Sequence, residues 1–401
     1  MRQSSQRFDK IVFGIRNETR LADAFKDGYT PDDIKHGVIE LLSLYFSNSD
    51  VLEKSAVNIL MSDAIALANL SKNTLAFDLF EYAFAIHQRA YLQDKNTCVQ
   101  ASVEWQPAIY EGLSIFWSQY HLELDKQNLP DDEFLHECLR NIGTITEGAI
   151  KHLIKELLQQ QRVANGDYVS EGGTKDIGFG VAINELYRTS PNPKLFAPQG
   201  VRLSQWRNIA QHLSAHVEGT EFICKYGKPQ KEIRLSRIEL YQITKHILDL
   251  FSGLKLANTF FTVDHMSELV DAGLTPESMR KRNEMEISHI VYVLLSQGFE
   301  VVDFQRDEKE SKLVVRDMTS LDPDKRKIHT VQFVDLLWRY AKSQIVSVEY
   351  IEQDGTPNFR TSATADLFSK IEKEHLHPSV IANEAEMIDL KNNLIIPKGT
   401  N

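Results

Sequence analysis

Apolar residues recur at every third or fourth position over most of the first 263 residues, which is the spacing of helices that bury one face. In the first part of the chain, this pattern predicts helices over residues 34–46, 51–70 and 74–91. Aromatic residues are dense here, and their helical spacing favours a packed core over a surface that stacks bases. A proline-containing break at 128–132 ends the region, so we expect a helical N-terminal domain over residues 1–130.

A second helical region covers residues 131–263 and predicts a four-helix bundle. Thr144-Ile-Thr-Glu147 resembles a capping box at the start of its first helix. The other helices are expected at 181–188, 203–219 and 236–261, with a small β-hairpin over 220–235. The glycine-rich segment 166–180 lacks the residue order of a phosphate-binding loop, so we interpret it as a connection.

From residue 275 onward, the pattern changes to short strands that alternate with helices. Strands are expected at 299–304, 312–317, 345–351 and 358–362, and helices at 276–295, 329–341 and 365–374. These elements predict a small α+β C-terminal domain over residues 276–401. The fold class is therefore mainly α, with a helical N-terminal region, a four-helix bundle and this α+β domain.

The predicted helix 203–219 differs from the others because its polar side carries residues with useful chemistry. Arg207, Asn208 and His212 lie opposite the apolar stripe, and Arg207 and His212 are about 140° apart around the helix axis. The stripe itself consists of Trp206, Ile209, Ala210, Leu213 and Val217. Such a helix can present a cation for a phosphate beside an imidazole that carries protons.

Composition limits the class of protein. Hydrophobic residues make up 42% of the chain and charged residues 25%, which is typical of globular proteins. We find no apolar signal core at the N-terminus and no apolar run of the roughly 20 residues that a membrane span needs. The three widely spaced cysteines indicate a reducing compartment and argue against a disulfide framework and a cysteine-based zinc site. We therefore expect a cytoplasmic protein without a membrane partner.

Charge is unevenly distributed along the chain. The net charge of −11 argues against a general nucleic-acid coat protein, whereas residues 201–237 contain seven basic and three acidic residues, a net +4. This segment either attracts a polyanion or is a chance cluster on a solvated surface. On the first interpretation, Arg202, Lys225 and Lys228 are the candidate substrate-binding residues.

Two metal sites are conceivable. His212 and His216 stand one helical turn apart, but no third ligand is in register, and we expect His216 to border the core. The second would be the site of a metal-dependent DNA nuclease, which uses an acidic residue and a lysine on strands. Candidates for these residues are Asp303, Glu310 and Lys312, although their spacing is irregular. We therefore expect neither a metal nor a cofactor and keep the DNA nuclease as an alternative.

The segment Arg207-Asn-Ile-Ala-Gln-His212 resembles the RNxxxH form of the R-x4–6-H motif of HEPN domains. Its surroundings are similar as well, with an opening helix of the type TEGAIKHLIKEL, the motif on the third helix and a long closing helix. The resemblance covers residues 131–263. In one branch of the family, a tyrosine two residues after the histidine is modified by a partner enzyme, and Ser214 stands there in this chain.

The resemblance implies a metal-independent endoribonuclease of the kind found in toxins and in abortive-infection, anti-phage defence systems. Two HEPN domains pair so that both Arg/His helices line one cleft, so the implied partners are RNA and a second copy of the chain. Arg207 would hold the phosphate, His212 would move protons, and Asn208 would position either one. The flanking domains would then sense a trigger or respond to a regulatory protein. The alternative function is a non-catalytic helical scaffold or nucleotide sensor.

Overall fold

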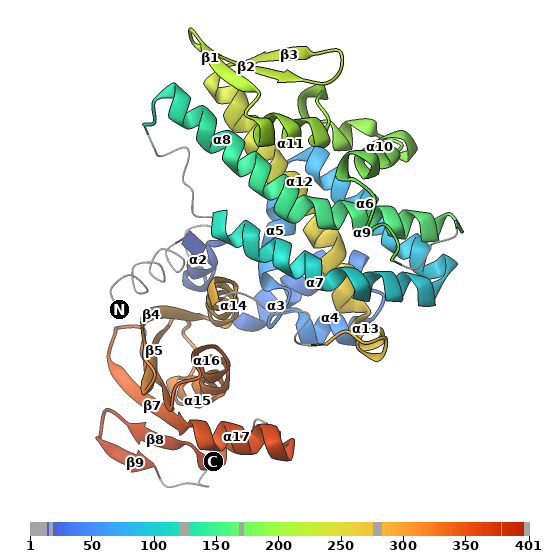
Figure 1. The fold of residues 1–401 in the computed structure, drawn as a ribbon. Helices are drawn as coiled ribbons and strands as arrows, with labels where there is room; N and C mark the ends of the chain where they lie inside the picture. Colours follow the sequence, from blue (N-terminus) through green and yellow to red (C-terminus); the bar gives the residue numbers. More distant parts are fainter. Residues whose placement is uncertain are drawn as a thin grey trace. The chain divides into compact units, whose positions relative to one another are not determined.

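The computed structural model describes residues 14–15, 19–119, 128–167, 172–275, 283–377 and 379–396 (Figure 1). The chain forms two compact units. The helical unit comprises residues 44–51 and 63–281, and the α+β unit comprises residues 1–43, 52–62 and 282–401. Residues of the segment 1–130 thus contribute to both units. The chain is mainly helical with a sheet-containing C-terminal region, which confirms this part of the expected fold class.

Most of the helical unit consists of long helices, and a small antiparallel sheet lies at one end (Figure 1). Its helices are α5 (Met61–Leu70), α6 (Thr74–Gln93), α7 (Lys95–Gln119), α8 (Asp131–Ile145), α9 (Lys151–Ala164), α10 (Phe179–Thr189), α11 (Leu203–His212), α12 (Arg237–Asp264) and α13 (Met266–Asp271). Its strands are β1 (Ala215–Glu218), β2 (Glu221–Tyr226) and β3 (Lys231–Leu235), in that order in the sheet. The predicted hairpin is therefore confirmed and gains a third strand.

Aromatic residues of the helical unit form a core around α6 and α12. The Phe80 ring packs edge-on against Tyr45 at 5.0 Å and against Phe260 at 5.7 Å between ring centroids. Gly253 lets the two helices approach closely, because a Cβ there would lie 2.7 Å from the carbonyl oxygen of Ala76. Each fully buried ring contributes roughly 1.5–3 kcal/mol to folding. The interpretation of the aromatics as core residues is confirmed for Phe80, Phe84 and Trp105, which are buried.

Two local predictions in the helical region are wrong. The expected helix 51–70 is two helices, α4 (Ser49–Ser55) and α5, because a turn intervenes in which the Leu60 N–H donates to the carbonyl of Ser55 at 2.9 Å. Thr144-Ile-Thr-Glu147 is not a helix start: α8 continues through a π-helical turn, Thr146–Ile150, directly into α9. Thr144, the N-cap residue of the expected capping box, therefore lies inside α8.

The α+β unit has helices against a six-stranded sheet (Figure 1). The strands are β4 (Phe299–Arg306), β5 (Glu310–Asp317), β6 (Ile345–Ile351), β7 (Pro357–Thr364), β8 (Glu386–Asp389) and β9 (Leu394–Ile396), in sequence order across the sheet. The β5–β6 pair is parallel and the other pairs are antiparallel. The helices are α2 (Leu21–Lys26), α3 (Pro31–Leu42), α14 (Asn283–Ser296), α15 (Pro323–His329), α16 (Phe333–Ala341), α17 (Ala365–Glu374) and α18 (Val380–Glu384).

The predicted strands and the helix 365–374 of this unit are confirmed, whereas residues 276–282 of the predicted helix 276–295 lie outside the described residues. On β6, all residues from Val346 to Ile351 are buried, so this strand is covered on both of its faces. Within the described part of the chain, none of the helices has the length and apolar character needed to span a bilayer.

Candidate functional site

Helix α11 carries the Arg/Asn/His motif. Its ten residues have the predicted division into an apolar side and a polar side. Leu203, Trp206 and Ile209 are buried, and the Trp206 indole N–H donates to the Pro198 carbonyl at 3.2 Å. Arg207 and Asn208 are half-buried, and His212 is exposed. The apolar stripe therefore anchors the helix and leaves the motif on its open side.

The expected continuation of this helix to residue 219 is wrong. Leu213 adopts a left-handed conformation with φ of 47°, and the Ser214 N–H donates to the Ile209 carbonyl at 3.0 Å, which ends the helix. The chain then enters β1, where pairing with β2 stabilises an extended backbone. Leu213 is consequently 57% exposed, so it does not belong to the apolar stripe, and neither does Val217 on the strand. A left-handed leucine costs about 1 kcal/mol or more, so tertiary pairing overrides local preference here.

The end of α11 also removes the helical spacing of His212 and His216. His216 lies on β1 and is exposed, so the expectation that it borders the core is wrong. Among the described residues, no group of three or more His, Cys, Asp or Glu side chains is arranged to hold a metal ion.

Close packing between α8 and α11 brings Arg207 to an acidic partner. A Cβ on Gly143 would lie 3.2 Å from the Cβ of Ala210, so glycine permits the helices to approach at this point. Glu147 lies one helical turn beyond Gly143, and Arg207 lies one turn before Ala210. These two side chains therefore face each other. The Arg207 Nε is 3.0 Å from the Glu147 Oε2. This N–H is not aligned for a hydrogen bond, so the contact is an ion pair.

Other neighbours complete the surroundings of Arg207. Its Nη1 donates to the Asn208 side-chain oxygen at 3.2 Å, and the guanidinium lies 5.9 Å from the centroid of the Phe179 ring on α10. Glu147 also pairs with Lys151 at 2.7 Å. Burial raises the pKa of Glu147, but Lys151 and Arg207 outweigh burial and hold it below its usual value, so Glu147 is a carboxylate at neutral pH.

For Glu147 the sequence favours a capping role over a polar role in the cleft, and it does not predict the contact with Arg207. Glu147 lies in the π-helical turn between α8 and α9, a distortion that is frequent at functional sites. The sequence contained only a weak signal for this arrangement, the spacing of four between Glu147 and Lys151. The packing of two helices far apart in sequence could not be inferred from it.

His212 is the last residue of α11. Its imidazole makes no hydrogen bond or ion pair within the described part of the chain, and the side chain is exposed. Both ring nitrogens are therefore available to an external group. The structure places Arg207, Asn208 and His212 on the same helix, with the first two tied to their surroundings and the third open.

The three candidate substrate-binding residues differ in their surroundings. Arg202 donates to the Asn184 side-chain oxygen at 2.7 Å and stacks over the Tyr187 ring at 4.7 Å, so it is held against α10. Lys225 is on β2, opposite Glu232 in the register with β3, and Lys228 is exposed in the turn between these strands. Of these three residues, Arg202 alone lies next to the motif helix, directly before the start of α11.

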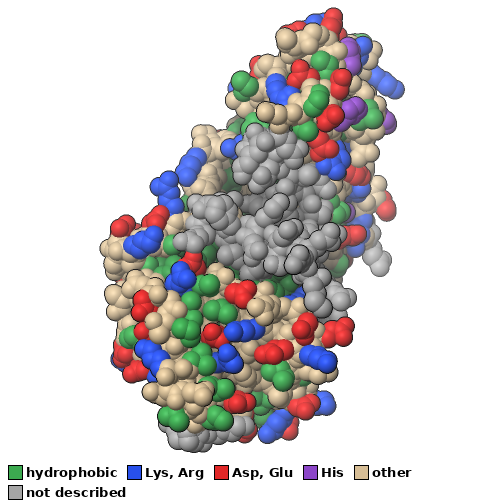
Figure 2. Space-filling model, turned by 90° about the vertical axis from the view of Figure 1, so that its left-hand side faces the viewer, with side chains coloured by type: hydrophobic (Ala, Val, Ile, Leu, Met, Phe, Trp, Pro, Cys, Tyr) green, Lys and Arg blue, Asp and Glu red, His purple; other side chains and the backbone are tan. Residues whose placement is uncertain are grey.

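Ion pairs reduce the positive charge of the segment 201–237. Arg234 lies within 3.5 Å of carboxylate oxygens from Glu218, Glu221 and Glu232, which are all three acidic residues of the segment. Arg237 pairs with Asp131 at 2.7 Å, outside the segment. Basic and acidic side chains are also intermixed over the face drawn in Figure 2. Of the seven cations of the segment, Arg234 and Arg237 are therefore paired with carboxylates.

In the α+β unit, the residues of the alternative nuclease site are separated. Lys312 pairs with Glu349 at 2.7 Å, and Asp303 is opposite Val314 on β5, four residues beyond Glu310. The Asp303 carboxylate accepts a hydrogen bond from Gln305 at 2.9 Å. These contacts pair the groups with neighbours on the sheet and do not assemble them around a common point.

No family model matches this chain, and neither a curated protein nor a solved structure is found to match it. The resemblance to HEPN domains therefore depends on the residues of α11 and on their surroundings alone.

Proposed function

We propose that the protein is a metal-independent endoribonuclease of the HEPN type, which acts as a toxin or abortive-infection effector in anti-phage defence. The observation that carries the proposal is the open side of α11, where a tethered guanidinium and an exposed imidazole belong to one helix. Catalytic groups on a helix held by buried residues are positioned more precisely than groups on a loop.

The chemistry of RNA cleavage suits these groups. Attack by the ribose 2′-OH needs a base for its proton, an acid for the departing 5′-oxygen and positive charge beside the crowded phosphate. A guanidinium has five N–H groups. The Arg207 Nε faces Glu147 and one Nη1 N–H goes to Asn208, which leaves the Nη2 edge for phosphate oxygens. His212 supplies one proton-transfer group near neutral pH.

One protomer supplies one such histidine, whereas the reaction uses a base and an acid. We therefore propose that a second copy of the chain completes the site, with the two α11 helices on either side of one phosphodiester. Because the nucleophile belongs to the substrate, the reaction needs no metal ion.

The test is cleavage of total cellular RNA by the full chain in EDTA. We expect Arg207→Ala and His212→Ala each to reduce the cleavage rate about 100-fold or more, the usual contribution of a positioned proton-transfer group or of an oxyanion-stabilising donor. His216→Ala and Arg188→Ala are matched controls, since both replace exposed side chains of the helical unit, and they should retain the wild-type rate. Equal rates in all five proteins, or cleavage that EDTA abolishes, would contradict the proposal.

A nucleotide-sensing function is the second candidate, and it is favoured by a cavity in the α+β unit.

A further inference from the structure

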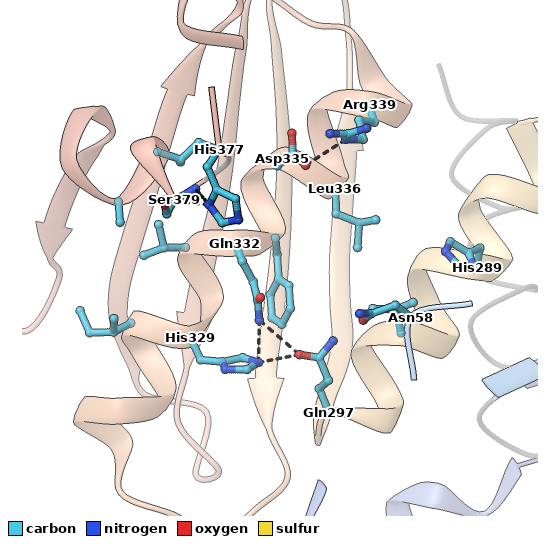
Figure 3. Close-up of a pocket in the computed structure, with 16 residues that line it drawn as sticks. Asn58, His289, Gln297, His329, Gln332, Asp335, Leu336, Arg339, His377 and Ser379 are labelled. Carbon is cyan, nitrogen blue, oxygen red and sulfur yellow. Dashed lines mark hydrogen bonds and ion pairs between the residues drawn. The ribbon is translucent and has the colours of Figure 1, made fainter. Parts of the chain in front are cut away.

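The α+β unit contains a cavity of about 600 Å³, drawn in Figure 3. It is lined by residues of α14, α15, α16 and α18, by the segments around them and by Asn58. Apolar side chains such as Val293, Phe333 and Ile381 form part of the wall. This volume and this mixture of an apolar wall with a few polar groups are typical of sites for small molecules.

Three polar side chains, Gln297, His329 and Gln332, converge at one side of the cavity (Figure 3). The His329 Nε2 lies 2.5 Å from the Gln297 Oε1 and 2.7 Å from the Gln332 Nε2, and these two amide atoms are 3.3 Å apart. One ring nitrogen cannot donate to the first amide and accept from the second at the same time. The three side chains therefore do not satisfy one another completely.

Hydrogen-bonding capacity consequently remains on this side of the cavity. Among the described residues, the Gln297 Nε2 and the Gln332 Oε1 have no hydrogen-bond partner, and they are a donor and an acceptor. A ligand that offers a donor and an acceptor on one edge would pair with them. The edges of nucleobases have this property, and in nucleic-acid complexes a glutamine amide pairs with the N6 and N7 atoms of adenine.

His329 stays neutral beside these amides. The residue is exposed overall, but its ring packs against Phe299 and Phe333. This desolvation, together with the nearby charge of Arg326, lowers the pKa of His329 to about 4, while Asp317 acts in the opposite direction. This side of the cavity therefore suits an uncharged group.

Arg339 and His377 lie elsewhere on the cavity wall. Arg339 pairs with Asp335 at 2.9 Å, one helical turn apart on α16, and its side chain is 62% exposed. The His377 Nδ1 is 2.9 Å from the Ser379 hydroxyl (Figure 3). A phosphate can exchange one exposed ion pair of Arg339 for a charge-assisted hydrogen bond.

We propose that this cavity binds a mononucleotide, with its base against the Gln297 and Gln332 amides and its phosphate toward Arg339 and His377. This binding site is additional to the proposed ribonuclease function and consists of different residues. The cavity is large enough for a nucleoside with one phosphate, because pockets for small ligands have volumes of about 300–1,000 Å³.

Isothermal titration of the full chain with AMP, GMP, CMP and UMP tests the proposal. At least one nucleotide should bind, and Gln297→Leu and Gln332→Leu should each weaken its binding tenfold or more. Arg339→Gln should weaken nucleotide binding and leave binding of the matching nucleoside unchanged. Gln344→Leu is the control, since Gln344 is an exposed glutamine of the same unit outside the cavity lining, and it should bind as the wild type does.

Two outcomes would overturn the proposal. The first is that none of the four nucleotides binds to the wild type. The second is that ribose 5-phosphate binds as tightly as the best nucleotide, which would mean that the base is not recognised. Thermal melting of each variant distinguishes lost contacts from lost folding. The RNA-cleavage assay is independent, so failure of either proposal can be recognised separately.

Discussion

Two histidines of the helical unit, His87 and His212, differ in burial and in hydrogen bonding. Between α6 and α9, His87 and Glu156 are each 1% exposed. The His87 Nε2 lies 2.9 and 3.0 Å from the two Glu156 oxygens, and its Nδ1 lies 2.8 Å from the Ala83 carbonyl. On α11, by contrast, the ionic partner of Glu147 is Arg207, and His212 is left exposed.

The difference teaches that residue type alone does not indicate function. Both nitrogens of His87 face acceptors, and Gln160 donates to the Glu156 carboxylate at 3.1 Å, so the His87 ring and the Glu156 carboxylate are satisfied by their own chain. Burial also prevents a substrate from reaching them. On α11, the Nη2 edge of Arg207 and the ring of His212 remain available to an external group. The buried pair therefore contributes to stability, and these groups on α11 are the candidates for chemistry.

The sharpest test of this comparison removes each histidine in the same way. His87→Leu leaves the Glu156 carboxylate buried without its partner, so we expect a loss of about 3–5 kcal/mol in the free energy of unfolding. His212→Leu changes an exposed side chain and should alter this free energy by less than about 0.5 kcal/mol. Urea denaturation followed by circular dichroism measures both variants. Similar losses in the two would contradict the division into a structural and a functional histidine.

A second test concerns the carboxylate that positions Arg207. Glu147→Gln removes the charge that orients the guanidinium, and we expect kcat for RNA cleavage to fall about tenfold, because small displacements of a positioning group reduce the rate. Stability should change by less than about 1 kcal/mol, as is usual for a partly exposed ion pair.

Glu185→Gln is the matched control for this test. The Arg162–Glu185 pair has side-chain exposures of 29% and 35%, almost the same as the 28% and 35% of the Arg207–Glu147 pair. Glu185→Gln should leave kcat unchanged. A tenfold loss in both variants would mean that the effect comes from general destabilisation.

The smallest effect expected is on the pH dependence of stability. Burial lowers the pKa of His87, but the charge and hydrogen bonds of Glu156 outweigh burial, so the pKa lies above its usual value of 6.5. The folded state thus prefers the charged ring, and this stabilisation is complete below pH 6.5 and lost as the pH rises through the raised pKa. The difference in unfolding free energy between wild type and a His87→Leu/Glu156→Leu double variant, in which neither group titrates, should therefore shrink as the pH rises from 6.5 through the raised pKa of His87. Denaturation series at several pH values measure it, and a difference that grows with pH would contradict the assignment.

Much of the local structure follows from the sequence, and the reason is that it depends on neighbouring residues. The helix 365–374 is found as Ala365–Glu374, and the long closing helix begins after Ser236, whose hydroxyl and Glu239 form a capping box. The motif residues Arg207, Asn208 and His212 could be named as a candidate site because three turns of one amphipathic helix carry them all.

Tertiary structure decided the rest. α11 ends at His212 because β1 pairs with β2, and that pairing is absent from local periodicity. Glu147 meets Arg207 because Gly143 lets α11 approach α8, and His87 meets Glu156 across 69 residues of sequence. The sequence by itself determined which segments are helices or strands and which side chains have useful chemistry. Which of these side chains are buried and hydrogen-bonded, and which remain open to a substrate, was decided only by the packing of distant segments. The reason is that burial and ion pairing depend on neighbours in space.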